Sequence, residues 1–230
     1  MKYILGLDLG QASDWTAMAV LQRIVTVRDA ERPIKVNGVT CMERYREALP
    51  AEFPCRHLER APLGTSYPTI VARVRGLMFD PAIRGQTALV VDATGVGRPV
   101  VDMLREAGLK PIPVTITGGD AVSRDGAGWR VPKRDLVGAV QVLLQSQRLK
   151  FAAEMPLVST LVAELKAFRV KVSEQGHDSY GAWREGSHDD LVLALAVAAW
   201  YGERWTAPAE APPSMSFDSL LPGRAYPVRR

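Results

Sequence analysis

One stretch of the chain, residues 87–108, decides the fold and reads TALVVDATGVGRPVVDMLREAG. Thr87 to Val91 is a run typical of a strand that is covered on both faces, and it ends at Asp92 before a glycine turn. A helix is predicted from Arg98 to Ala107, with Gly108 as its stop signal. A strand, a turn and a helix in this order form one βα unit, which indicates an α/β protein.

The chain before this unit has the pattern of strands joined by short connections. Tyr3 to Leu9 is predicted as a buried first strand, and Gly10 to Asp14 connects it to a second strand over Thr16 to Val27. A third strand is predicted over Val39 to Tyr45. The prolines within residues 50–62 then mark an irregular connection, because proline cannot continue a β ladder comfortably.

Apolar periodicity predicts the remaining elements. They are helices at Tyr67 to Met78, Lys133 to Ser146 and Pro156 to Phe168, strands at Ile112 to Thr117 and Leu149 to Phe151, and a hairpin of Val170 to Glu174 with Tyr180 to Arg184. Gly118 to Gly128 is polar and rich in glycine, which predicts a mobile loop. The last helix is predicted to begin at Ser187 or His188 and to be buried, because Leu191 to Trp200 is apolar almost all round.

The composition predicts one globular domain followed by a tail. A length of 230 residues, with 47% hydrophobic and 23% charged residues, fits a single domain over residues 1–205. Residues 206–230 are rich in proline and lack periodicity, which predicts an extended or disordered tail. Cys41 and Cys55 are too few for a disulfide scaffold, and no apolar segment approaches the roughly 20 residues that span a bilayer. We therefore expect a cytoplasmic protein without membrane contact.

The charge balance permits binding to a polyanion without demonstrating it. The formal net charge is +4 and the isoelectric point is about 9.2. Basic residues gather in one segment and are candidate contacts to a DNA backbone: Arg124, Arg130, Lys133 and Arg134. Such contacts weaken as salt increases. A solvated side chain at a helix start is the plain alternative for Lys133.

Acidic residues stand at three places where hydrophobic packing alone would not put them. Asp8 lies inside the apolar first strand, Asp92 ends an apolar strand, and Asp189 with Asp190 opens the apolar last helix. In open α/β sheets, sites form at the carboxyl ends of strands, which is where Asp92 stands. A carboxylate on the adjacent first strand converges with it. If the last helix packs on the sheet, its first turn brings Asp189 or Asp190 to the same point.

A cluster of three or four carboxylates implies a bound cation. Carboxylates at this density repel one another unless cations neutralise them, and hard oxygen ligands suit Mg²⁺ or Mn²⁺. Two such ions, about 3.5 to 4 Å apart, activate a water and stabilise the leaving oxygen in phosphodiester hydrolysis. The residues therefore predict a site for two ions of Mg²⁺ or Mn²⁺.

Each acid also has a plainer interpretation when it is taken alone. Asp8 can be a turn former, and Asp92 can form an Asx-turn. Asp189 or Asp190 can serve as an N-cap or as a partner of the helix dipole. Only the coincidence of all of them favours the metal site.

Two further residues are accessory candidates for this site. Asp14 lies across the first turn from Asp8, although an aspartate in a hairpin turn needs no catalytic role. His188 stands beside the acidic pair and is placed to contact phosphate or a metal-bound water, with local packing or capping as its alternative.

Four motifs in order resemble the nuclease domain of phage terminase large subunits, over about residues 1–205. They are GLDLGQASDWTAMAV (residues 6–20), VVDATGVGRPVVDMLREAG (90–108), VPKRDLVGAVQVLLQSQRLKF (131–151) and GSHDDLVLALAVAAW (186–200). The resemblance implies a ribonuclease H-like mixed central sheet flanked by helices. It also implies an endonuclease that cuts concatemeric viral double-stranded DNA during genome packaging.

The resemblance assigns roles by position. Asp8, Asp92 and Asp189 match the metal-binding acids, and Asp190 is a fourth candidate ligand. Asp8 would bridge two ions, Asp92 would hold the second metal, and Asp189, with or without Asp190, would hold the metal that activates water. The implied partners are a terminase ATPase domain or subunit, the small terminase and the portal.

This chain departs from complete terminase large subunits in one respect. Those proteins carry an ATPase, whereas this sequence contains no G-x-x-x-x-G-K-[ST] phosphate loop. DNA translocation is therefore not expected from this chain alone.

Other functions fit parts of the same pattern. A Holliday-junction resolvase would share the acids and the metals. The run Gly6 to Gly10 also resembles the first phosphate-contacting hairpin of sugar kinases and actin-like ATPases, which need two such lobes and a longer chain. A non-catalytic DNA-binding packaging module would use only the basic segment at residues 123–134.

Overall fold

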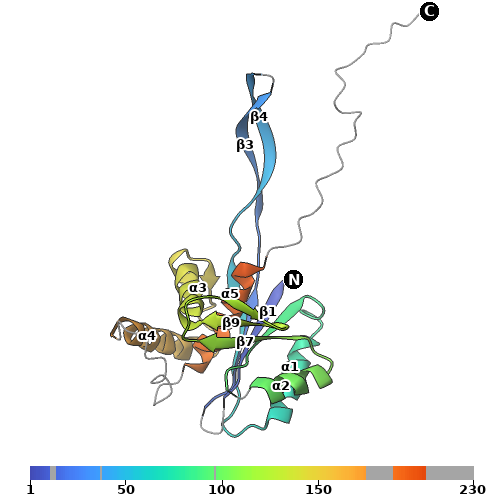
Figure 1. Cartoon of the computed structure of the whole chain (residues 1–230), viewed down its shortest axis with the longest axis vertical. Coiled ribbons are helices and arrows are strands. Elements are labelled where there is room, and N and C mark those ends of the chain that lie inside the picture. The colour runs from blue at the N-terminus through green and yellow to red at the C-terminus, as the bar shows by residue number, and fades with distance from the viewer. Residues whose placement is uncertain (11–13, 37, 96, 175–188, 206–230) are drawn as a thin grey trace, which may run out of the picture.

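In the computed structural model, which describes residues 1–10, 14–36, 38–95, 97–174 and 189–205, an eight-stranded mixed sheet forms the centre of the molecule (Figure 1). Its order is β10-β5-β2-β1-β6-β7-β9-β8. The strands are β1 (Tyr3–Asp8), β2 (Ala17–Gln22), β5 (Phe53–Arg60), β6 (Thr87–Asp92), β7 (Pro111–Thr117), β8 (Ser123–Asp125), β9 (Gly128–Pro132) and β10 (Leu149–Lys150). β2 is antiparallel to β1 and β5, whereas β6, β7 and β9 continue parallel to β1. The arrangement confirms the predicted α/β fold with a mixed central sheet flanked by helices.

Helices cover both faces of this sheet and create two hydrophobic cores. They are α1 (Tyr67–Met78), α2 (Gly97–Glu106), α3 (Lys133–Gln145), α4 (Val158–Glu174) and α5 (Asp190–Arg204). Apolar side chains of α1 and α2 pack on one face with Leu5, Leu7 and Val91. Those of α3, α4 and α5 pack on the other face with Ile4 and Val90. The alternation of side chains along β1 and β6 thus decides which residues meet α5.

The final helix is the central element of the second core, as predicted. Nearly every side chain of α5 from Asp190 to Trp200 is buried, because α3, the sheet and α4 surround it. It begins at Asp190, so the predicted start at Ser187 or His188 is two to three residues too early. No helix in the described residues is long and apolar enough to span a membrane.

A two-stranded ribbon projects from the body of the molecule (Figure 1). It consists of β3 (Val27–Val36) and β4 (Val39–Ala48), paired antiparallel from Val27 opposite Ala48 to Val36 opposite Val39. The predicted second strand over Thr16 to Val27 is therefore wrong in its second half, since β2 ends at Gln22 and the chain then enters the ribbon. The strand predicted over Val39 to Tyr45 exists but belongs to this ribbon.

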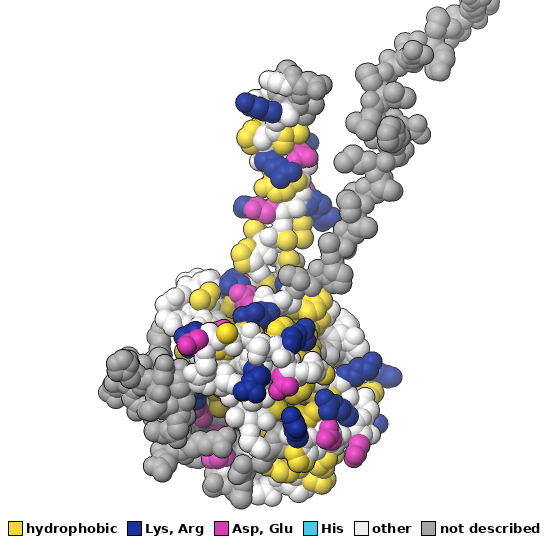
Figure 2. Space-filling view, in the orientation of Figure 1, with side chains coloured by type: hydrophobic (Ala, Val, Ile, Leu, Met, Phe, Trp, Pro, Cys, Tyr) yellow, Lys and Arg dark blue, Asp and Glu magenta, His cyan; other side chains and the backbone are white. Residues whose placement is uncertain are grey.

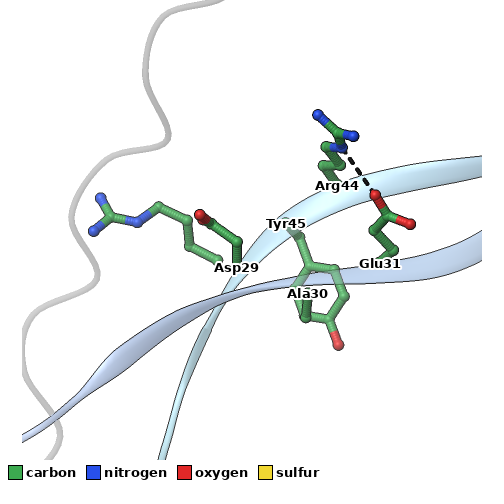
Figure 3. A pocket seen from close by; sticks show the side chains of 6 residues that line it. Asp29, Ala30, Glu31, Arg44 and Tyr45 are labelled. Carbon is green, nitrogen blue, oxygen red and sulfur yellow. Dashed lines mark hydrogen bonds and ion pairs between the residues drawn. The ribbon is translucent and has the colours of Figure 1, made fainter.

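Charges on the ribbon neutralise one another across its two strands. The exposed ion pairs are Arg28–Glu47, Arg32–Glu43 and Arg44–Glu31, and Asp29 stands opposite Arg46 in the ladder. Basic and acidic side chains consequently alternate along it in Figure 2. A shallow hollow lies at its side, lined by Asp29, Ala30, Glu31, Arg44, Tyr45 and Arg46, and the Glu31–Arg44 pair spans it (Figure 3).

Three segments differ from the prediction for identifiable reasons. The irregular connection predicted within residues 50–62 is wrong, because β5 is a strand whose pairing with β2 begins at Cys55, after Pro54. The loop predicted over Gly118 to Gly128 contains β8, which pairs with the unpredicted β9 as a short hairpin. The strand predicted over Val170 to Glu174 is wrong, because α4 continues through Glu174. Its predicted partner over Tyr180 to Arg184 and the tail at 206–230 lie outside the described residues.

Candidate active site

Two aspartates lie side by side where β1 and β6 end. Leu7 of β1 is paired with Val91 of β6 in a parallel ladder, so the next residues, Asp8 and Asp92, stand at the same level of adjacent strands. Strand alternation directs both toward the face that α5 covers. Asp8 is only 7% exposed and Asp92 only 6%. The two acids that the sequence singled out therefore lie together at the carboxyl edge of the sheet.

A glycine in β1 lets α5 approach these aspartates closely. A Cβ atom at Gly6 would overlap the backbone carbonyl of Ala194 and crowd the side chain of Ala198. Asp190, Ala194 and Ala198 are spaced four residues apart and therefore lie along one face of α5. Because Ala194 packs on Gly6, the preceding turn of the helix carries Asp190 toward Asp8. Asp190 is itself only 6% exposed.

The carboxyl groups influence one another electrostatically. Burial is the largest cause that raises the pKa of Asp8 well above its usual range. The negative charges of Asp92, Asp190 and Asp189 raise the pKa further, in decreasing order. A hydrogen bond between the side chains of Asp8 and Asp92 also favours the protonated form, since one of two bonded carboxyls must carry a proton. In the absence of a cation, burial and the neighbouring carboxylates thus favour the protonated form of Asp8.

A local turn fixes one oxygen of Asp92. Its Oδ1 accepts the backbone N–H of Thr94 at 2.8 Å, which forms the Asx-turn that the sequence allowed. The Thr94 hydroxyl in turn accepts the backbone N–H of Ile116 at 2.8 Å and ties this turn to β7. The plainer interpretation of Asp92 and its position in the acidic cluster are thus both correct. The turn orients the carboxylate that the cluster uses.

Asp189 stands at the N-cap position of α5 and is partly buried. In the described part of the chain its side chain makes no capping hydrogen bond to the helix, so the predicted alternative of a capping carboxylate does not account for it. Its backbone carbonyl accepts the N–H of Leu193 at 2.9 Å. Its charge acts on Asp8, although more weakly than that of Asp190.

Two charged residues beside the cluster were missed by the sequence analysis. Arg60, at the end of β5, forms an ion pair with Glu164 of α4 and lies 3.5 Å from Asp190, measured from Nη2 to Oδ2. Burial raises the pKa of Glu164 to about 7, against the opposing effect of Arg60. Glu164 gave one signal in the sequence, an acid on the apolar stripe of a predicted helix. Arg60 gave none, because its strand was predicted as an irregular connection.

The donor set fits a hard divalent cation. Asp8, Asp92 and Asp190 are buried carboxylates whose mutual repulsion a cation would relieve, and oxygen ligands suit Mg²⁺ or Mn²⁺. Among the described residues, no three His, Cys, Asp or Glu side chains are already positioned to hold a metal ion together. Asp8 and Asp92 share a hydrogen bond, and Asp190 lies 3.5 Å from Arg60, whose closer partner is Glu164.

The accessory candidates are placed less centrally. Asp14 is partly buried at the entry to β2 and is not among the charges that raise the pKa of Asp8. His188 lies outside the described residues.

The basic segment occupies the β8–β9 hairpin and the start of α3. Arg124 stacks on Trp129 with its guanidinium 3.7 Å from the ring centre, and Arg134 pairs with Asp120 at 2.6 Å. Arg130 is exposed on β9, and Lys133 is partly buried just after that strand ends. Because β9 is parallel to β6, Lys133 lies at the same edge of the sheet as Asp92. Arg124 and Arg134 thus have structural partners, and Lys133 is the basic residue that the topology brings to the acidic edge.

Two solved structures are similar in fold to this chain. The large terminase nuclease from thermophilic phage G20c is 20% identical, with a TM-score of 0.48 over 86% of this chain and 80% of that chain. The human cytomegalovirus terminase nuclease domain is 10% identical, with a TM-score of 0.42 over 86% of this chain and 84% of that chain. No family model and no curated protein matches the chain. At these values the likeness carries no conclusion about activity.

Proposed function

We propose that the chain is a metal-dependent endonuclease that hydrolyses phosphodiester bonds of double-stranded DNA. The observation that carries this proposal is the burial of Asp8 beside Asp92 at one edge of the sheet, with the charges of Asp189 and Asp190 acting on the same carboxyl. A protein that concentrates carboxylates in this way loses stability unless a cation compensates their charge. Such clusters occur where function requires them.

Asp8, Asp92, Asp190 and Asp189 are the residues that would hold two ions of Mg²⁺ or Mn²⁺. When bound, such ions supply Lewis-acid chemistry for phosphodiester hydrolysis, which includes activating a water and stabilising the leaving oxygen. Asp92 is pre-oriented by the Thr94 amide, and Asp8 would bind an ion in its charged form, which its raised pKa disfavours. Cleavage should therefore increase as pH rises through the ionisation of this pair.

Binding to the DNA backbone is assigned to the basic segment. Lys133 is the first candidate because it lies at the acidic edge of the sheet, and Arg130 is exposed on the adjoining strand. Arg124 and Arg134 could contribute charge from their paired positions. The biological setting that we propose is viral genome packaging in the host cytoplasm, with a terminase ATPase domain or subunit, the small terminase and the portal as partners.

Incubation of supercoiled plasmid with the purified chain in EDTA, Mg²⁺ or Mn²⁺ tests this function. We expect nicking and linearisation that require the divalent ion. Asp92→Asn should abolish cleavage, whereas the matched control Asp102→Asn, which changes an exposed aspartate of α2, should cleave like the wild type. A folded wild-type protein that binds duplex DNA but never cuts it would instead support a non-catalytic packaging module.

The same assay with a four-way junction beside a linear duplex addresses the resolvase alternative. A terminase-like nuclease should cut both substrates at similar rates, since the acidic site itself selects no DNA shape. Preferential cutting of the junction would favour a Holliday-junction resolvase.

A further inference from the structure

Arg60 lies in the same row of the sheet as the acidic cluster. In the ladders, Asp8 of β1 stands opposite Ala17 of β2, and Ala17 stands opposite Arg60 of β5. The small side chain of Ala17 therefore separates the first aspartate from the guanidinium. Arg60 is held from the other side by the ring of Trp15, at 5.3 Å from the ring centre. A partly buried cation thus stands near the proposed metal site.

Glu164 is the primary partner of this cation. The Arg60 Nη2 atom contacts Glu164 Oε1 more closely than it contacts Asp190 Oδ2, from which it is 3.5 Å away. The second oxygen of Glu164 accepts the backbone N–H groups of Leu191 at 3.1 Å and Val192 at 3.3 Å. The Glu164 carboxylate consequently binds the first turn of α5 through one oxygen and forms an ion pair with Arg60 through the other.

We propose that Glu164 is a positioning residue that keeps Arg60 from capturing Asp190, so that Asp190 remains able to bind a divalent cation. This inference rests on the proposed metal-dependent function. Arg60 and a metal ion are both cations, and they compete for the same buried carboxylate. Because Glu164 neutralises Arg60, the balance favours the metal.

The competition predicts a specific pattern of Mn²⁺ affinities. Glu164→Gln keeps the length of the side chain and an oxygen for the Leu191 and Val192 amides. It removes the negative charge that forms an ion pair with Arg60. Arg60 should then pair with Asp190, and Mn²⁺ affinity should fall roughly tenfold, which corresponds to about 1.4 kcal/mol. Adding Arg60→Met to this variant removes the competing cation. The double variant should recover affinity to within about threefold of the wild type, since neutral replacements of buried ion pairs are commonly tolerated.

Mn²⁺ binding followed by electron paramagnetic resonance measures these affinities without any DNA. Glu154→Gln, on an exposed glutamate, is the matched control and should bind like the wild type. If Glu164 only caps α5, Glu164→Gln will bind Mn²⁺ like the wild type, because it keeps the capping oxygen, and that result would overturn the proposal. A loss of affinity in Glu164→Gln that Arg60→Met does not restore would overturn it as well.

A second measurement separates this inference from the proposed function. Hydrogen exchange at the Leu191 and Val192 amides should accelerate in Glu164→Ala and remain slow in Glu164→Gln. If the wild type binds no Mn²⁺ at Asp8 and Asp92, the proposed metal site fails, and so does the competition between Arg60 and a metal. If the wild type binds Mn²⁺ but Glu164→Ala leaves exchange and affinity unchanged, the positioning role alone fails.

Discussion

At the scale of single residues, the structure explains why the aspartates could be found from the sequence and their neighbours could not. Asp8 and Asp92 each end a run of apolar strand residues, and a charged residue at that place can be recognised from the sequence alone. Arg60 and Glu164 acquire their roles only through contacts between residues separated by 104 positions. Arg60 lies in a segment that was predicted as an irregular connection, so no predicted strand or helix made its charge stand out.

The buried carboxyl of Asp8 should destabilise the protein when no cation is present. A raised pKa in the folded state means that the folded protein binds the Asp8 proton more tightly than the unfolded chain does. The contribution of Asp8 to the free energy of unfolding is therefore greatest at low pH and falls as pH rises above the ordinary pKa of aspartate. Asp8→Asn removes this cost. We expect the variant to gain about 1 to 4 kcal/mol at pH 8 in EDTA, the range seen when buried charges are replaced by neutral groups.

Thermal unfolding of both proteins from about pH 4, near the ordinary pKa of aspartate, to about pH 8 checks this prediction. The wild type should lose stability relative to Asp8→Asn as pH increases. If Asp8→Asn is less stable than the wild type at pH 8, the buried carboxyl of Asp8 does not destabilise the folded protein.

At the scale of elements, the contact of α5 with β1 brings the helix acids to the sheet. Gly6→Ala would place a methyl group on the Ala194 carbonyl, and overpacking of this kind costs typically about 1 to 3 kcal/mol. The helix must shift away from β1, which would also move Asp190 from Asp8. We expect a lower melting temperature together with weaker Mn²⁺ binding.

Gly76→Ala is the matched control, because a Cβ at that position in α1 meets nothing within 4 Å. Its melting temperature and Mn²⁺ affinity should equal or exceed those of the wild type. Unchanged Mn²⁺ affinity in a folded Gly6→Ala protein would contradict the role assigned to this contact.

The β3–β4 ribbon is an independent element that the core should not need. Its two strands pair with each other, its ion pairs are exposed, and such pairs contribute about 0 to 1 kcal/mol each. Replacing residues 28–47 with an Asn-Gly turn should therefore leave cooperative unfolding intact and the melting temperature within a few degrees. Loss of the cooperative transition in circular dichroism would show that the ribbon supports the core.

The elements that the sequence predicted well are those with strong local patterns. α1 has its predicted bounds, and β6, α2 and α3 agree within about one residue. β3 and the pairing that makes the ribbon were missed because both strands carry charge on both faces, with no apolar side to mark them, whereas β4 was predicted in part. β9 was missed because Arg130 and Pro132 obscure a strand whose burial comes from α3 and β7.

At the scale of the whole molecule, the sheet order brings distant segments to one edge. β1, β6 and β9 run parallel, so Asp8, Asp92 and Lys133 follow strands that end on the same side, and α5 adds acids from the far end of the chain. This convergence could be predicted once a mixed sheet was expected. The contact of Arg124 with the ring of Trp129 and the ion pair of Arg134 with Asp120 could not, because each joins residues on different strands or on a loop and a helix.

The central claim is that Asp8 and Asp92 share divalent ions at this edge of the sheet. Crystals grown with MnCl₂ and measured at the manganese absorption edge test it most directly. We expect anomalous density within coordination distance, roughly 2 Å, of carboxylate oxygens from both residues, with the hydrogen bond between them broken. Saturating Mn²⁺ that leaves Asp8 and Asp92 hydrogen-bonded to each other, with no anomalous peak beside them, would contradict it.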